Sequence, residues 1–381
     1  MAIKREWITN VMDGTPEWHE ARKDHIGSSE TAAVCGVEKF GDTRMMIYHK
    51  KVGSEPEERW TNELVFHGKQ QESYNAFLWS HYDGPGDGYV HNAEAGKVIR
   101  KCRNLHGMIV NPKYPFLSCN VDRVSVAGSQ MLNSDAGFSG KISDDPFIVE
   151  MKNINFFYEK SLESESGFPN SYVYQAMQQM IVTETDYSEI AMFIGGNSYK
   201  VAPVYRDNHI CQEILDKGSD FWNLVKIGRK WYQLYLEAIS LGDNEKAQEC
   251  LAQIYTYEPD PGASKRDADY LSGRHGAEEG SSIMADDSTY ELAIQHRKVS
   301  GLKKAIEESE TLLANKLRYL FVQNRVEKIN LPNGQLKYTL RKGGVNKTLT
   351  NSAPKPDERE VAIMKELVLK ESRVDISLLE S

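Results

Sequence analysis

The stretch FIVEMKNINF, residues 147–156, carries one acid and one base among apolar side chains. Read as a β-strand, its alternation places Glu150 and Lys152 on one face, and Val149 and Met151 on the other. A carboxylate can hold a divalent cation, and a lysine two residues further on can hold or deprotonate the attacking water at the same centre. The simpler alternative is an ordinary ion pair on a half-exposed strand.

Two further acids lie upstream in apolar surroundings. Asp122 falls in SCNVDRVSV, which is predicted to be a strand, and a hairpin between this strand and FIVEMKN would bring Asp122 beside Glu150. Glu72 falls in HGKQQESYNAFL, which is predicted to be part of a long helix. The apolar face of that helix is predicted to hold Val65, Phe66, Phe77 and Leu78.

The segment NSYVYQAMQQMIVTE, residues 170–184, is predicted to be a helix that carries Gln175 and Gln179 one turn apart on one face. An oxygen-rich set of carboxylates selects Mg²⁺, or Mn²⁺ in its place, rather than zinc. Two such ions about 4 Å apart can stabilise both the attacking and the leaving oxygen of a phosphodiester. Two or three carboxylates and one lysine are the minimum set for this chemistry. His67 and His106 are predicted to be structural.

This order of motifs resembles the PD-(D/E)xK nuclease superfamily, and more closely the phage-type alkaline exonucleases typified by phage lambda exonuclease and the YqaJ-type viral recombinases. The resemblance covers about Trp18 to Val204. The pieces that carry it are WHEARKDHIGSSE, HGKQQE, VDRV, VEMKN and YQAMQQMIVT.

The resemblance implies a role for each motif residue. Asp122 and Glu150 would be the central metal ligands, with the Met151 carbonyl as a third oxygen. Lys152 would position or activate the water, and Glu72 would hold the metals or their waters from its helix. Gln175 and Gln179 match the glutamine positions of the family's YQ helix and would support the site.

Arg22 and Ser29 fall where such enzymes bind the 5′-phosphate of a DNA end. Two alternatives stay open for them. Arg22 could instead pair with Glu17 or Glu20, and Ser28 or Ser29 could cap a helix that ends at Gly36 after a turn at residues 26–28. Capping and phosphate binding are compatible at a helix N-terminus.

The sequence departs from the family's pattern at three places. Val121 precedes Asp122 where the motif often has proline, and Met177 stands where many relatives have a second glutamine. Residues 126–147 are rich in Gly, Ser and Asp and are expected to form an insertion loop. None of these departures removes an expected metal ligand.

The resemblance implies a Mg²⁺-dependent 5′-to-3′ exonuclease that degrades one strand of duplex DNA from an end. The product would be a 3′ single strand for a single-strand annealing protein in phage-type recombination. A homo-oligomer, a trimeric ring around DNA, is implied by the family alone. One alternative is an endonuclease or repair nuclease with the same metal site. Another is a non-catalytic scaffold protein that binds DNA ends.

The composition is that of a globular protein, with 40% hydrophobic and 27% charged residues among 381. A net charge of −9 argues against a generally basic surface but allows a local basic channel. The five cysteines have no metal-binding spacing and are expected to be free, mostly buried thiols. We see no signal peptide or membrane span and expect a cytoplasmic protein, in the host cell if a phage encodes it.

The elements that must position these residues are those of an α/β fold, a restriction-endonuclease-like core with a central mixed sheet flanked by helices. We assign residues 1–257 to this nuclease domain, 258–287 to a polar linker, 288–352 to a long helix and a basic hairpin, and 353–381 to a tail with one short helix.

The long helix is predicted over residues 288–323, where an apolar residue recurs every seven positions from Leu292 to Leu320. It could lie on its own domain or form a coiled-coil seam, because Gln295 and Ser309 are polar at the second heptad position. The hairpin is predicted to turn at residues 332–334 and to contact phosphates or face solvent. Its basic residues are Arg325, Lys328, Lys337, Arg341, Lys342 and Lys347.

Overall fold

The computed structural model describes residues 3–37, 41–55, 63–133, 135, 137–154, 169–274, 282–332, 334–340 and 347–351. The chain forms two compact units, Met1–His275 and Gly276–Ser381. The tail assigned to residues 353–381 lies outside the described residues, as do Arg341 and Lys342. Among the described residues, no helix combines the length and the apolar character that a membrane crossing needs.

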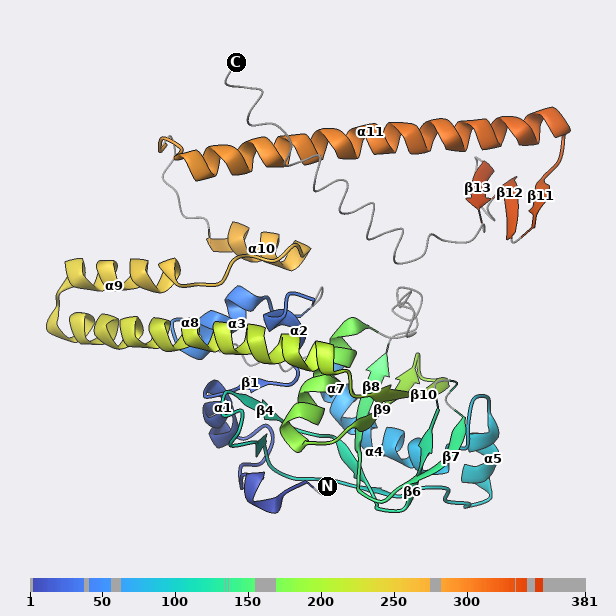
Figure 1. Cartoon of the computed structure of the whole chain (residues 1–381), viewed down its shortest axis with the longest axis horizontal. Coiled ribbons are helices and arrows are strands. Elements are labelled where there is room, and N and C mark those ends of the chain that lie inside the picture. Colours follow the sequence, from blue (N-terminus) through green and yellow to red (C-terminus); the bar gives the residue numbers. More distant parts are fainter. Residues whose placement is uncertain are drawn as a thin grey trace. The chain divides into compact units, whose positions relative to one another are not determined.

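A five-stranded mixed sheet forms the centre of the first unit, in the order β10-β9-β8-β5-β2 (Figure 1). Strands β8 and β9 are parallel, and the other neighbours are antiparallel. The motif strand β8 therefore lies in the middle, with a partner on each side. The strands are β2 (Cys102–Arg103), β5 (Arg123–Ser125), β8 (Ile148–Ile154), β9 (Tyr187–Ile194) and β10 (Ser198–Tyr205).

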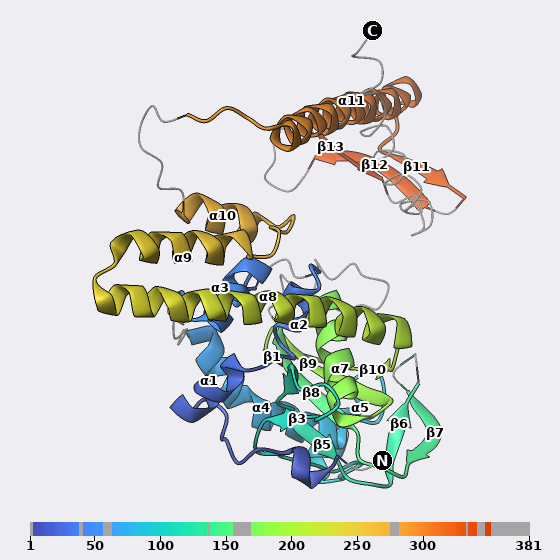
Figure 2. The ribbon, with the colours of Figure 1, turned by 60° about the vertical axis from the view of Figure 1, so that its left-hand side comes forward.

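Both faces of β8 are buried, each under different helices. Ile148 and Ile154 share one apolar cluster with Met180 of α7 (Asn170–Thr183) and with α8 (Asn208–Leu241). Val149 shares a second cluster with Trp79 of α4 (Glu63–His81). Figure 2 shows α8 running past α7 and the short helix α2 (Thr31–Val34). Glu150 and Lys152 are two and four positions after Ile148 in the strand, so their side chains lie on the same face as Ile148, the face that α7 covers.

The predicted apolar face of α4 is wrong in part. Phe66 and Phe77 are exposed, whereas Leu78 and Trp79 are buried. The helix carries apolar residues on several sides, so the sequence does not single out the side that packs on the sheet.

A smaller sheet, in the order β1-β4-β3, precedes the central one. Of the turn expected at residues 26–28, Ile26 and Gly27 form the short strand β1 and Ser28 begins a turn. Helix α2 begins at Thr31 after Glu30, without a side-chain cap. The prediction that Ser28 or Ser29 caps this helix is therefore wrong. The elements here are β1 (Ile26–Gly27), β3 (Ile109–Val110), β4 (Leu117–Cys119), η1 (Arg5–Trp7), α1 (Pro16–Lys23), α3 (Arg44–Val52) and α5 (Gly88–Glu94).

The insertion loop expected over residues 126–147 is largely a β-hairpin. Strands β6 (Ser129–Leu132) and β7 (Phe138–Ser143) form a two-stranded antiparallel sheet of their own. The Leu132 N–H donates a hydrogen bond to the Tyr187 hydroxyl of β9 at 2.9 Å. The hairpin is thus attached to the central sheet.

The polar linker expected over residues 258–287 contains a helix that belongs to the first unit. Helix α10 (Lys265–Arg274) follows α9 (Asn244–Thr256). Its Tyr270 hydroxyl donates to Glu55 at 2.6 Å, and Arg274 pairs with Glu258 at 3.0 Å. The linker assignment is therefore corrected for Lys265–Arg274.

The second unit consists of a long helix and a three-stranded sheet. Helix α11 (Asp287–Asn324) confirms the predicted helix, and β11 (Lys328–Leu331) pairs with β12 (Gly334–Leu340) as the predicted hairpin. A third strand, β13 (Lys347–Asn351), was not predicted as part of a sheet. Phe321 is buried, with its ring 5.8 Å from that of Tyr338.

The expected α/β class is confirmed, with a central mixed sheet, flanking helices, and a long helix and hairpin near the C-terminus. The five cysteines are free, and four of them are buried, as the sequence predicts. Burial raises the pKa of the Cys35 thiol to about 12.

Candidate functional site

Asp122 lies where the chain passes from the small sheet to the central one. Strand β4 ends at Cys119 and β5 begins at Arg123, which pairs with Val149 of β8. The Met151 N–H donates to Asp122 Oδ2 at 2.8 Å. The structure thus places Asp122 beside the Glu150 strand, as predicted. The single strand predicted over SCNVDRVSV is instead β4 and β5, and Asp122 lies between them.

Glu150 is 4% exposed, and side chains hydrogen-bond to both of its oxygens. Oε1 accepts from Gln175 Nε2 at 2.6 Å and from Lys152 Nζ at 2.7 Å, and Oε2 accepts from Gln179 Nε2 at 2.6 Å. Helix α7 therefore presents two amides to one carboxylate. Three side chains that the sequence predicted for the site, Lys152, Gln175 and Gln179, thus meet on this carboxylate.

Lys152 Nζ donates to Glu150 Oε1 and, at 2.9 Å, to Gln175 Oε1. Its ammonium also lies 4.9 Å from the ring centre of Tyr172. Burial alone would lower the pKa of Lys152, but the Glu150 and Asp122 carboxylates outweigh burial and raise it. The charged side chain can donate hydrogen bonds to a water or to a phosphate oxygen.

The Asp122 and Glu150 carboxylates repel each other. Burial and the neighbouring Glu150 raise the pKa of Asp122 well above its usual range, although Lys152 opposes the rise. Among the described residues, no group of three or more His, Cys, Asp or Glu side chains is placed to hold a metal ion. The Asp122 and Glu150 carboxylates and the main-chain oxygen of Met151 are hard oxygen donors, which fit Mg²⁺ or Mn²⁺.

Glu72 approaches from the opposite face of the sheet, because it stands on α4. Its carboxylate lies 3.9 Å from Arg123 Nη1, and its side chain is 36% exposed. Burial raises the pKa of Glu72, Arg123 lowers it and Glu150 raises it further. Glu72 is thus electrostatically coupled to Glu150 but does not complete a three-acid cluster with Asp122. Arg123 was not predicted as a site residue, although it follows Asp122 directly.

Arg22 and Ser29 contact each other. Arg22 Nη2 donates to Ser29 Oγ at 2.8 Å and pairs with Glu30 at 3.1 Å. The alternative pairing with Glu17 or Glu20 is not what the structure shows, and Glu20 pairs with Lys23 at 2.6 Å instead. The alternative of a partner within α1 is wrong, because the chain folds back through β1 and brings Glu30 to α1.

A second cation completes this cluster. Lys51 Nζ lies 2.9 Å from Glu30 Oε2 and donates to the Arg22 carbonyl at 2.9 Å. Burial would raise the pKa of Glu30, but Arg22 and Lys51 outweigh it and lower the pKa to about 2. A side chain at Gly27 would put its Cβ 3.2 Å from Arg22 Nε, so the glycine leaves room for the guanidinium. Neither Glu30 nor Lys51 was predicted from the sequence.

Asn120 connects the Arg22 helix to Gln179, which donates to Glu150. Its Oδ1 accepts from Trp18 Nε1 of α1 at 3.1 Å, and its carbonyl accepts from Gln179 at 3.3 Å. Gln178 connects α7 to two adjacent strands of the small sheet, because its amide donates to the Ile26 carbonyl of β1 and the Ser118 carbonyl of β4 at 2.8 Å each. Gln178 was not predicted as a site residue. The signal that the sequence offered was its position as a polar residue in the largely apolar run MQQMIV.

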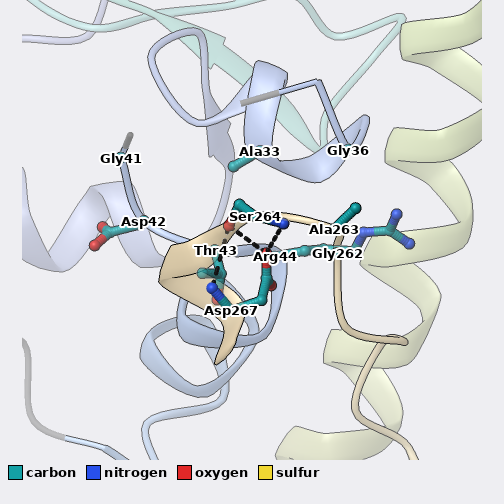
Figure 3. A pocket seen from close by; sticks show the side chains of 10 residues that line it. All are labelled: Ala33, Gly36, Gly41, Asp42, Thr43, Arg44, Gly262, Ala263, Ser264 and Asp267. Atoms are coloured by element: carbon teal, nitrogen blue, oxygen red, sulfur yellow. Dashed lines mark hydrogen bonds between the residues drawn. The ribbon is translucent and has the colours of Figure 1, made fainter. Parts of the chain in front are cut away.

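A separate hollow lies between the starts of α3 and α10 (Figure 3). Ser264 and Asp267 cap α10 reciprocally, with the Asp267 N–H donating to Ser264 Oγ at 3.1 Å and the Ser264 hydroxyl donating to Asp267 Oδ2 at 2.5 Å. Gly36, Gly41 and Gly262 lie along its wall. None of the residues predicted for catalysis lines it.

Comparison with known families bears on the region that holds the site. Residues 17–186 match the YqaJ-like viral recombinase domain, and this range contains every site residue predicted from the sequence. The resemblance that the motifs indicated is thereby confirmed for this range. The curated protein YqaJ of Bacillus subtilis is 24% identical over 241 residues, which are 63% of each chain. The chain thus spans less than two thirds of that relative.

Solved exonuclease structures are similar to part of the chain. The alkaline exonuclease LHK-Exo of Laribacter hongkongensis shares 16% identity at a TM-score of 0.40, over 60% of this chain and 100% of its own. A phage-related exonuclease from Haemophilus somnus 129PT shares 10% identity at a TM-score of 0.33, over 54% of this chain and 96% of its own.

Proposed function

We propose that this protein is a Mg²⁺-dependent 5′-to-3′ exonuclease that degrades one strand of duplex DNA from an end. The observation that carries the proposal is the constellation of the buried Glu150 with the half-buried Asp122 and Lys152, in the range that matches the YqaJ-like viral recombinase domain. The product would be 3′ single-stranded DNA for a phage-type annealing protein.

The chain's own residues divide the work. Asp122, Glu150 and the Met151 carbonyl would hold the metal, with Glu72 reaching it or its waters from α4. The bound ions would supply a hydroxide at neutral pH and neutralise charge on the phosphate. Lys152 orients the water by donating hydrogen bonds, and Gln175 and Gln179 fix the Glu150 carboxylate from α7.

The Arg22 cluster supports the preference for a DNA end. A guanidinium beside a serine hydroxyl can hold a terminal phosphate through charge-assisted hydrogen bonds. Arg22 is already oriented by Glu30 and Ser29, so less of its conformational freedom is lost on binding. Holding the 5′-phosphate at one fixed place would give the reaction its direction. The implied homo-oligomer is part of this proposal and rests on the family alone.

Digestion of linear and circular duplexes, with and without Mg²⁺, tests the proposal. The wild-type protein should digest linear DNA that has 5′-phosphates and leave closed circles intact. Lys152→Ala should lower the rate at least about 100-fold, because it removes the donor to the attacking water. Its affinity for DNA should survive, since phosphate contacts elsewhere provide it.

Lys246→Ala is the matched control, because Lys246 forms an exposed ion pair with Glu249. This variant should cut normally, and the melting temperatures of both variants should show that they fold. Cleavage of closed circles would favour an endonuclease with the same site. Absence of any metal-dependent cleavage by the wild type would favour a DNA-end-binding scaffold, and near-normal turnover by Lys152→Ala would refute the mechanism.

A further inference from the structure

An apolar stripe runs along α11, and it is exposed. Its members recur every seventh residue, and Ile306 at the centre is 54% exposed while Leu313 is 60% exposed. Phe321 is the one α11 residue that is buried among the described residues, so the sheet of the second unit leaves the stripe uncovered. The stripe consists of Leu292, Val299, Ile306, Leu313 and Leu320.

The charges of α11 change sign at its middle. A basic block precedes Ile306 and an acidic block follows it, within one or two turns on each side. The basic residues are Arg297, Lys298, Lys303 and Lys304, and the acidic residues are Glu307, Glu308 and Glu310. Helix α11 spans residues 287–324, so the change of sign lies near its midpoint.

This distribution favours one orientation of a paired helix. Two copies of α11 side by side in parallel would set basic block against basic block, with Lys298 of one copy facing Lys303 of the other at the positions that flank the seam. Two antiparallel copies would set basic block against acidic block. Lys303 of each copy would then face Glu310 of the other.

We propose that α11 is a self-association surface, which binds a second copy of this chain in antiparallel orientation through the apolar stripe. The pair has a two-fold axis near the middle of the helix, so the same patch is used on both sides. In the register that joins Lys303 to Glu310, Leu302 of one copy lies beside Leu313 of the other.

The mass of the full-length protein in solution tests the pairing. Ile306→Asp places a charge at the centre of the stripe and should halve the mass relative to the wild type. Thr311→Asp is the matched control, because Thr311 is exposed on the other side of the helix, and it should keep the wild-type mass. Equal masses for the wild type and Ile306→Asp would overturn the proposal.

Charge exchange tests the orientation. Lys303→Glu and Glu310→Lys should each weaken the pairing at least several-fold, and the double variant should restore it because opposite charges face each other again. A stronger association of Lys303→Glu alone would indicate parallel helices and contradict the proposal.

Disulfide formation gives a second measurement of the orientation. Leu302→Cys alone should form no covalent dimer on mild oxidation, whereas a mixture of Leu302→Cys and Leu313→Cys should form one. A covalent dimer of Leu302→Cys by itself would overturn the antiparallel arrangement, since only parallel helices bring the two copies of this residue together.

Discussion

The two units differ in the solvent exposure of their charged side chains. In the first unit, the acid and the base of β8 are enclosed and hydrogen-bonded to α7. In the second unit, the charges of α11 are exposed, and the ion pair from Lys303 to Glu307 spans 3.9 Å. Hydrogen bonds within an enclosed site hold each side chain in one position, as a catalytic reaction requires. Charged side chains on an exposed surface can instead favour a binding partner of complementary charge.

The largest contrast should come from replacing a buried amide side chain of the first unit and an exposed one of the second. Gln179→Ala removes a donor from the buried Glu150 carboxylate. The loss should cost about 1–3 kcal/mol of stability, because a buried charged acceptor loses its partner. It should also lower the cleavage rate about 100-fold, because Glu150 loses its fixed orientation. Denaturant unfolding and initial cleavage rates measure the two effects.

Asn315→Ala on the exposed face of α11 is the matched control for Gln179→Ala. The free energy of unfolding should change by less than about 0.5 kcal/mol, as at other surface positions. Equal effects of the two substitutions would mean that the buried amide adds nothing to the site.

Glu30 should make the stability of the first unit depend on pH. Its pKa in the folded protein is about 2, below its usual value of 4.5, because Arg22 and Lys51 outweigh burial. The stabilisation is therefore complete above pH 4.5 and is lost as the pH falls toward 2, by about 3 kcal/mol in total. Glu30→Gln should be less stable at pH 7 and should show a flatter dependence of stability on pH over this range. Parallel curves for the two proteins would contradict the assigned pKa.

Arg22 should affect the choice of DNA end rather than cutting as such. Arg22→Ala should reduce the rate advantage of 5′-phosphoryl over 5′-hydroxyl duplexes about 10-fold, because the guanidinium beside Ser29 would no longer hold the terminal phosphate. The two rates are compared on otherwise identical DNA. An unchanged ratio would show that the phosphate binds elsewhere.

The smallest effect should come from the second unit. The register of β11 and β12 places Lys328 opposite Lys337, and like charges on directly opposite residues favour a bound anion. A chain ending at residue 275 keeps α10 and should cleave at low salt. Its DNA binding should be weaker and less salt-dependent, since each lost phosphate contact lowers the slope by roughly 0.9. An unchanged slope would mean that this sheet faces solvent or protein.

The parts of the site that the sequence predicted are those set by short-range geometry. Alternation along one strand put Glu150 and Lys152 on one face, and a helical turn put Gln175 and Gln179 on another. Pairing with the preceding strand put Asp122 beside them. Heptad spacing likewise predicted α11, because one period is sustained along the whole helix.

The parts that the sequence missed depend on packing between distant segments. Lys51 reaches Arg22 from α3, and nothing near Arg22 in sequence indicates this contact. Helix α4 has apolar residues on several sides, and only the tertiary structure determines which side packs on the sheet. Helix α10 had a local signal, the Ser264–Asp267 capping pair, but its polar composition resembled that of a linker.

The buried thiols have a practical consequence for labelling. A maleimide reacts with an accessible thiolate, and Cys35, Cys119, Cys211 and Cys250 are all buried. Burial also raises the pKa of Cys102, whose side chain is only partly covered, so little of its thiolate is present at neutral pH. A single cysteine introduced on α11 should therefore take up a fluorophore far faster than the native thiols. Distances within a complex on DNA could then be followed in the otherwise natural chain.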